Sequence, residues 1–438
     1  MKWLVLAVLC GLLQACGGSS GPQAPIESAD ACSIGQQRET LRAFMQDKYY
    51  WYAQLQEPDE SATSMEAYFH SMLAPQDRFS FSESTAAHTA LFTEGRRTGY
   101  GYTLMWADAA QTSFRVRNVE PASPVARAGL TRGDTILAID GYAPVEIAQG
   151  ALPVVTTPGV TRHFVVANIA GERREFDVVS EDFPLTPVAN TATFDITRDG
   201  APVKVGYINY SQFVGYSVPY LNLAFINFRQ AGIGELILDL RYNGGGSVGT
   251  SRDLASMIGG ARTAGQLYSY LRFSDRQSAS TQQFRFNTAQ TSFALPLPNG
   301  LPRVVVIASG DTASASELLV NGLRPFVDVV LVGETTYGKP YGFIPRDICG
   351  TTYNAVQFES LNSLGQGGFT SGFTPDCAVP DDFTHALGDA NEGRTRVALN
   401  YLATGSCGAA PQGRLAAPKA APPRGTFGET PPPGMFPQ

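Results

Sequence analysis

The 438-residue sequence has few ionisable side chains. Aspartate, glutamate, lysine and arginine together make up only 16% of it, and it contains only four histidines. No Cys-x-x-Cys pair and no cluster of cysteine and histidine occurs, so nothing supports a metal site. No run of lysine and arginine is present and the net charge is −7, which argues against nucleic acid as a partner. The length predicts two or three domains, and a hydrophobic content of 43% is enough for real cores.

Long hydrophobic runs are also missing. The apolar stretch 3–13 is too short to cross a bilayer as a helix. It ends in Leu-Gln-Ala-Cys16, which resembles a bacterial lipobox and predicts a signal peptide over 1–15, with Cys16 acylated. Residues 16–31 would then be a flexible tether, and Gly17 after the cysteine implies the outer membrane, by resemblance to other lipoproteins. A plain secretory signal peptide is the alternative.

Cysteine is scarce as well, with six residues in all. One lies in the predicted signal peptide and Cys16 would carry the lipid. The remaining four are an even number in an oxidising compartment, which favours two disulfides. Four cysteines allow three pairings, and we favour Cys349–Cys377 with Cys32–Cys407.

The two ends of the chain outside the signal differ in pattern. Apolar residues recur near a period of 3.6 around Leu41 and Met45, and again over 65–72, so residues 32–97 are expected to form a helical domain. Residues 408–438 are rich in alanine, proline and glycine and should be disordered.

Residues 98–182 contain short strand-like runs, at 114–119 and 135–139. Between and after them stand Glu-Pro-Ala-Ser-Pro-Val-Ala-Arg-Ala-Gly-Leu, Arg-Gly-Asp and Ile-Asp-Gly, in an order that resembles the bacterial PDZ signature. Proline suits the first turn of the short helix in this string and glycine its C-terminus. A generic β-domain with one short helix is the alternative.

The peptide groove of such a domain would begin at Gly99-Tyr100-Gly101-Tyr102. Its glycines would let backbone N–H groups converge on a terminal carboxylate, and the next strand could pair with an incoming peptide. The plainer interpretation is that Gly99 and Gly101 only relieve a tight entry into the strand.

Residues 183–407 alternate apolar strand-like runs with helical segments, which predicts crossover units and a largely parallel sheet. The expected strands are 203–208, 235–240, 303–308 and 329–332, and the expected helices are 218–228, 253–258 and 316–326.

A possible nucleophile follows one of these strands. The run Ala-Ser-Gly-Asp-Thr-Ala-Ser-Ala-Ser-Glu over 308–317 joins a strand to a helix and places Ser314 at the helix start. Serine there is usually only a helix cap. Small neighbours would, however, allow a sharp turn and the approach of a substrate strand, and the helix N-terminus favours negative charge.

A possible base follows the next strand, in a glycine-bounded turn that carries Lys339. The plain interpretation is a solvated surface lysine. The turn and the serine lie at opposite ends of one helix–strand unit, so both reach the same edge of the sheet. A lysine acts as a base only when burial lowers its pKa, and small and aromatic neighbours permit that burial.

A third motif is Asn-Gly-Gly-Gly at 243–246, where a strand opens into a loop before a helix. No Gly-Lys-Ser/Thr follows, which argues against a nucleotide loop. Its N–H groups could hold a tetrahedral oxyanion together with the N–H of Ala315.

In this order the motifs resemble the C-terminal processing (tail-specific) peptidase family, over roughly 35–400. The resemblance implies a PDZ domain, a crotonase/ClpP-like α/β catalytic core, Ser314 as nucleophile and Lys339, 25 residues later, as general base. It implies oxyanion amides at Gly246 and Ala315, polypeptide substrates in the cell envelope, and neither cofactor nor metal.

One position departs from the family pattern, since Phe343 stands where a glutamine often orients the lysine. We therefore expect Thr336 to take that role. Two rivals remain: an inactive lipoprotein that binds peptides through the PDZ domain, and an acyl-CoA enzyme of the crotonase type, against which an exported location without CoA argues.

Overall fold

The computed structural model describes residues 32–108, 110–297, 300–408 and 434–436. Its first elements are helices, and side-chain caps explain where they start. The hydroxyl of Ser33 accepts from the N–H of Gln36, and Ser64 caps the second helix in the same way. The helices of this segment are α1 (Ile34–Lys48), η2 (Tyr52–Gln54), α2 (Met65–Ser71), α3 (Thr85–Thr89) and η3 (Ala90–Glu94).

The helical expectation for 32–97 is correct only in part. β1 (Phe81–Ser84) and β2 (Arg96–Gly99) are strands. β1 joins a three-stranded sheet with β19 (Thr351–Asn354) and β18 (Arg346–Ile348). The helical segment therefore shares a sheet with the part of the chain that follows Lys339.

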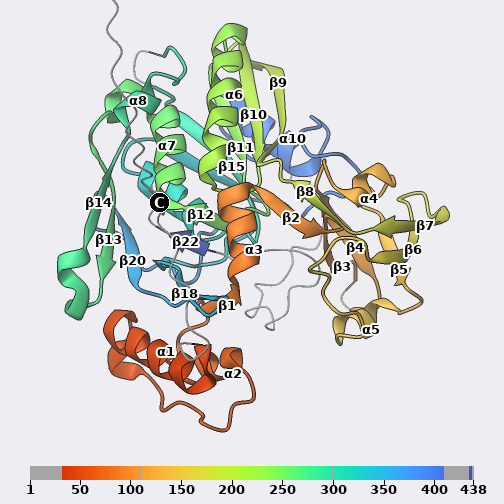
Figure 1. The fold of residues 1–438 in the computed structure, drawn as a ribbon. Coiled ribbons are helices and arrows are strands. Elements are labelled where there is room, and N and C mark those ends of the chain that lie inside the picture. Colours follow the sequence, from red (N-terminus) through yellow and green to blue (C-terminus); the bar gives the residue numbers. More distant parts are fainter. Residues whose placement is uncertain (1–31, 109, 298–299, 409–433, 437–438) are drawn as a thin grey trace, which may run out of the picture.

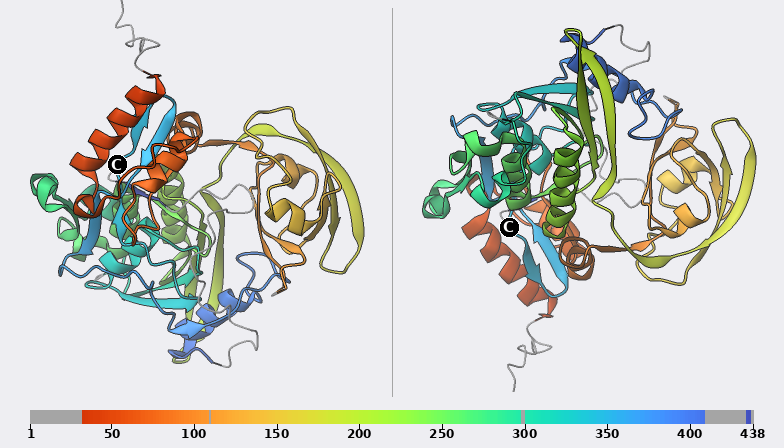
Figure 2. Two further views of the ribbon diagram at one scale, coloured as in Figure 1. Left: turned by 90° about the horizontal axis from the view of Figure 1, so that it is seen from below. Right: turned by 90° about the horizontal axis from the view of Figure 1, so that it is seen from above.

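A five-stranded antiparallel sheet forms a separate unit, which stands beside the rest of the molecule in both views of Figure 2. The strands expected at 114–119 and 135–139 are confirmed as β4 and β5. β3 lies at one edge, paired with β4 alone among the described residues. The unit contains β3 (Tyr102–Trp106), β4 (Phe114–Val119), α4 (Pro124–Arg127), β5 (Thr135–Ile139), α5 (Pro144–Ala148), β6 (Thr161–Ala167) and β7 (Arg173–Val179).

The remaining chain is built on a six-stranded sheet of order β21-β16-β15-β11-β10-β9, in which every pair is parallel except β9 and β10. The expected mixed α/β fold with a largely parallel sheet is confirmed. The strands are β9 (Val188–Arg198), β10 (Ala201–Tyr210), β11 (Glu235–Asp239), β15 (Arg303–Ala308), β16 (Asp328–Gly333) and β21 (Cys377–Ala378).

Both faces of this sheet are covered, so its strands are apolar at nearly every position. Along β15, Val304 and Val306 face one helical layer, and Val305 and Ile307 face the other. The first layer consists of α6 (Val218–Ala231), α7 (Val248–Gly259) and α9 (Ala315–Leu323), and the second of α10 (Gly393–Thr404) (Figure 1).

Smaller sheets complete the fold. A four-stranded sheet of order β14-β13-β20-β17 packs against α9, and β2 pairs with β8 (Glu181–Pro184) where the five-stranded unit joins the rest. The further elements are β12 (Gly245–Ser247), β13 (Leu267–Phe273), β14 (Gln282–Arg285), β17 (Tyr341–Gly342), β20 (Phe358–Asn362), η4 (Gly215–Ser217), η5 (Gly260–Thr263), η6 (Asp275–Ser280) and α8 (Thr288–Thr291).

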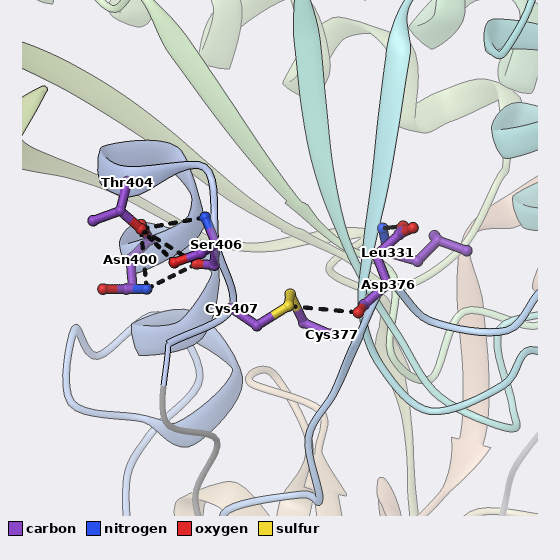
Figure 3. Close-up of a disulfide and its surroundings, with 7 residues drawn as sticks. All are labelled: Leu331, Asp376, Cys377, Asn400, Thr404, Ser406 and Cys407. Atoms are coloured by element: carbon purple, nitrogen blue, oxygen red, sulfur yellow. Dashed lines mark hydrogen bonds between the residues drawn. A yellow bond between two sulfur atoms is a disulfide. The ribbon is translucent and has the colours of Figure 1, made fainter. Parts of the chain in front are cut away.

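The four cysteines among the described residues form two disulfides, but the favoured pairing is wrong. Cys32 pairs with Cys349 because α1 packs beside β18 and the turn that follows it. Cys377 pairs with Cys407 because α10 returns to the sheet edge formed by β21 (Figure 3). Each bridge thus links elements that already share a hydrophobic core.

The predicted signal peptide, Cys16 and the tether lie outside the described residues. Among the described helices, none is long and apolar enough to span a bilayer. The expectation of disorder over 408–438 is wrong at one place. Gly434–Phe436 forms a strand, β22, which pairs with β12. Most of the rest of that tail lies outside the described residues.

Candidate active site

Ser314 lies in a turn between β15 and α9, with φ 63° and ψ −114°. A positive φ is strained for a residue with a side chain, and such strain persists only where the surroundings enforce it. Here the backbone carbonyl of Asn243 accepts from the N–H of Ala313 at 3.1 Å and from the hydroxyl of Ser316 at 2.9 Å. The Oγ of Ser314 is buried and has no hydrogen-bond partner among the described residues.

Glu317 joins the serine turn to the lysine turn. Its carboxylate accepts from the N–H of Ser314 at 3.0 Å, the N–H of Gly338 at 2.7 Å, the N–H of Lys339 at 2.8 Å and the hydroxyl of Thr336 at 2.6 Å. Burial raises the pKa of this carboxyl, and these hydrogen bonds oppose the rise. We did not predict this role, although the Ser-x-x-Glu spacing of a capping box was visible.

Lys339 is fully buried, as the sequence led us to expect of a base. Burial lowers the pKa of its ammonium to about 7, and the charges of Asp77 and Glu317 oppose that shift. Its Nζ donates to the backbone carbonyl of Phe79 at 3.2 Å and lies 4.8 Å from the ring centre of Phe343. At the position where the family often has glutamine, a buried aromatic ring therefore flanks the amine.

The carbonyl that receives the Lys339 hydrogen bond belongs to a loop organised by Asp77. This buried carboxylate accepts from the hydroxyl of Tyr49 at 2.6 Å, and from the N–H groups of Phe79 at 2.8 Å and Ser80 at 3.0 Å. The sequence analysis missed Asp77, since its only local signal is the end of a helical segment. The N-terminal segment thus supplies part of the lysine environment.

Thr336, the expected orienter of the lysine, contacts other groups. Its hydroxyl donates to Glu317 and accepts from the N–H of Phe373 at 2.7 Å. Its effect on Lys339 is therefore transmitted through the backbone of the turn.

The glycine loop lies against the start of α9. Gly246 has φ 133°, and a Cβ there would lie 2.0 Å from the carbonyl oxygen of Phe213, so only glycine fits. The side chain of Asn243 fixes the loop by accepting from the N–H of Gly245 at 2.9 Å. The N–H of Ala315 is in the first turn of α9, where amides lack an intrahelical acceptor.

The four residues expected to bind a peptide terminus run from the last residue of β2 to the first residue of β3. The ring of Tyr100 is buried in the core of the five-stranded unit, and its hydroxyl donates to the carbonyl of Val160 at 3.0 Å. A Cβ at Gly101 would lie 2.0 Å from the Cβ of Ser123, so close packing accounts for this glycine. Gly99 pairs with Glu181 on β8, and Tyr102 opens β3.

Two ion pairs connect the five-stranded unit to the larger domain. Arg117 pairs with Asp311, in the loop that leads to Ser314. Arg132 pairs with Asp381 at 2.8 Å, and Asp381 in turn pairs with the fully buried Arg241. The unit therefore contacts the segment immediately before the serine turn.

Two family models match this chain. The model of peptidase family S41 matches residues 204–379, and that of the peptidase S41 N-terminal domain matches residues 36–81. Together they cover more than half of the sequence, and they include Ser314, Lys339 and Asp77. The chain belongs to peptidase family S41.

Members of this family with curated names are similar over part of their length. The carboxyl-terminal-processing protease of Synechocystis sp. is 31% identical over 220 residues, which are 50% of this chain and 47% of the relative. The chloroplastic C-terminal processing peptidase of Tetradesmus obliquus is 24% identical over 260 residues, 56% of this chain and 52% of the relative. The chain thus spans about half the length of these S41 relatives.

A solved S41-family structure from Bacteroides fragilis covers more. It is 26% identical, with a TM-score of 0.65, over 83% of this chain and 96% of that one. The likeness therefore extends beyond the two segments that the family models match.

Proposed function

We propose that this S41 member is a serine endopeptidase of the C-terminal processing type, which cleaves unfolded or C-terminally exposed polypeptides. The observation that carries the proposal is the single carboxylate of Glu317, which holds the Ser314 turn and the Lys339 turn together. A buried serine in a strained turn and a buried lysine, held by one carboxylate, are the two side chains that a Ser/Lys nucleophilic mechanism would use.

In the proposed reaction, the Oγ of Ser314 attacks the scissile carbonyl carbon while the neutral Nζ of Lys339 takes its proton. The tetrahedral intermediate collapses to an acyl-enzyme, and the lysine passes the proton to the leaving amine. A water molecule then attacks the ester, again with Lys339 as base, which releases the acid and restores the serine. A pKa of about 7 makes the neutral amine available near neutral pH.

The negative oxygen of the intermediate would be held by the N–H groups of Gly246 and Ala315. Support comes from the contact of β12, which contains Gly246, with α9, the helix that begins at Ala315. Preorganised amides of this kind stabilise the charge that develops in the transition state.

We also propose that the five-stranded unit is a PDZ domain that binds substrate C-termini. Its edge strand β3 is open to an added strand, and its ion pair with Asp311 reaches the loop before Ser314. The test compares one unfolded substrate with a free and with an amidated C-terminus. Amidation should slow cleavage several-fold below saturation, whereas equal rates would show that the unit does not read C-termini.

The proposed location is the cell envelope, with Cys16 carrying a lipid anchor on the periplasmic side of the outer membrane. The lipobox-like sequence and the two disulfides support an exported protein. Replacement of Cys16 by alanine should move the protein from the membrane fraction to the soluble fraction. Retention of the variant in the membrane fraction would refute the proposal that Cys16 carries a lipid anchor.

The rival is a lipoprotein that binds peptides without cleaving them, as the loss of the usual glutamine at Phe343 would suggest. Incubation with casein separates the two. Turnover by the wild type and none by Ser314→Ala, at an equal thermal midpoint, supports the peptidase. No turnover by either protein supports the rival.

A further inference from the structure

The last described residues of the chain lie in the candidate active site. β22 (Gly434–Phe436) pairs in parallel with β12, so that Met435 stands opposite Gly246. β22 also contacts β17, the strand that begins two residues after Lys339. Figure 1 shows β22 beside β12 in the interior of the larger domain. The strand therefore lies between the candidate oxyanion loop and the segment that carries the candidate base.

The backbone polarity of β12 shows which groups face this strand. On one side, Phe213 donates to the carbonyl of Gly245 at 2.9 Å and accepts from the N–H of Ser247 at 2.8 Å. Successive residues of a strand direct their backbone groups to opposite edges, so the N–H and carbonyl of Gly246 face β22. In this parallel register, the carbonyl of Gly434 lies opposite the N–H of Gly246. A substrate carbonyl would occupy the same position.

The site is closed in this arrangement. The exposed fraction is 0% for Ser314 and 1% for Lys339. β22 occupies the edge of β12, so an extended polypeptide from another molecule could pair with that edge only after β22 leaves. The buried Oγ of Ser314 has no hydrogen-bond partner among the described residues, as expected of a nucleophile that is occluded but not reacting.

β22 belongs to the same chain as the cleft that it occupies, and residues 409–433 join it to the core. The disulfide Cys377–Cys407 fastens the chain to the edge of the central sheet immediately before the tail. Residues 409–433 can span at most ~80 Å at about 3.3 Å per residue. A ligand tethered in this way has an effective concentration on the order of millimolar, so weak pairing is enough to fill the site.

We propose that Gly434–Phe436 is an internal pseudosubstrate that adds a strand to β12 and excludes other polypeptides. The proposal rests on the peptidase function proposed for the same cleft. It predicts that substrates with an extended C-terminal segment compete with the tail for the edge of β12.

The first experiment measures binding without turnover, in the Ser314→Ala background. The probe is the synthetic peptide Pro-Pro-Gly-Met-Phe-Pro-Gln, which has the sequence of residues 432–438. A protein ending at 433 should bind it, and the full-length protein should bind it at least about tenfold more weakly, because the tethered tail competes. A full-length control that lacks 414–418 keeps the tail and should behave as the full-length protein.

The second experiment measures casein cleavage by the same chains with Ser314 restored. The chain ending at 433 should show kcat/KM about tenfold higher than the full-length protein, mainly through a lower KM. Equal peptide binding by the truncated and full-length proteins, or equal kcat/KM, would overturn the pseudosubstrate. Differential peptide binding without any turnover would instead keep the pseudosubstrate and overturn the peptidase.

Discussion

The serine turn and the lysine turn meet at one carboxylate but are built in different ways. Ser314 is positioned by its own domain, since the strand before it, the helix after it and the Asn243 carbonyl fix its backbone. Lys339 depends on a carbonyl 260 residues earlier in the chain, in a loop that Asp77 organises. The position of the proposed nucleophile therefore depends on the core alone, whereas the environment of the proposed base also depends on the N-terminal segment.

The environment of Lys339 therefore requires both the core and the N-terminal segment. Without the loop around Asp77, Lys339 would lose the acceptor of its Nζ. Lys339 would also lose part of the burial that lowers its pKa. Changes on the two sides should then have different signatures: those on the serine side alter rate alone, and those on the lysine side also alter the pH dependence.

The largest expected effect comes from the base itself. Lys339→Arg keeps a cation, but a guanidinium stays protonated and cannot accept the serine proton. We expect casein cleavage to fall by about 10²–10⁴-fold, the usual contribution of a general base. Initial rates at pH 8 measure the loss, with the Ser314→Ala variant as the control that gives the background rate. An arginine variant within tenfold of wild type would refute the role of Lys339.

Glu317→Gln tests the hydrogen bonds that link the serine turn to the lysine turn. Glutamine offers one carbonyl oxygen, so some of the four donors would face an NH₂ group. Each buried donor left unpaired costs about 1–3 kcal/mol, and we expect both a lower free energy of unfolding and about a hundredfold loss of kcat. Urea unfolding and casein kinetics measure the two effects. Asp328→Asn, at an exposed carboxylate on β16, should change neither.

The sequence predicted the core better than the site. Apolar runs located β15 and β16 closely, because a strand buried on both faces must be apolar throughout. The order of the motifs then singled out Ser314 and Lys339. Asp77 could not be found in this way, since its role exists only after a loop and a turn far apart in the chain come together. The cysteine pairing failed for the same reason, and composition alone gave no sign of β22.

Asp77→Asn tests the dependence on the N-terminal segment. In the wild type, the rate should rise with pH through about 7, because the amine of Lys339 must lose its proton. The charge of Asp77 raises the pKa of Lys339, so its removal should move the rising limb to lower pH and reduce the rate at the plateau about tenfold. An unchanged midpoint of the pH–rate profile would mean that the charge of Asp77 does not affect the pKa of Lys339.

Tyr49→Phe is the matched control for that experiment. It removes the hydroxyl that donates to Asp77 but leaves the carboxylate charge in place. We expect a lower thermal midpoint and no acid shift of the pH–rate profile. An equal acid shift in both variants would mean that loop disorder, and not the Asp77 charge, sets the pKa of Lys339.

The smallest effect is expected at Thr336, which contacts Glu317 and Phe373. Thr336→Val removes one donor to Glu317 and leaves the N–H of Phe373 without its acceptor, so we expect kcat to fall several-fold with little change in KM. Thr336→Ser keeps the hydroxyl and should restore most of the rate. Because Thr336 acts through the turn, neither variant should move the pH midpoint. A shifted midpoint in the valine variant alone would instead mean that the hydroxyl acts on the Lys339 amine itself, as the sequence first suggested.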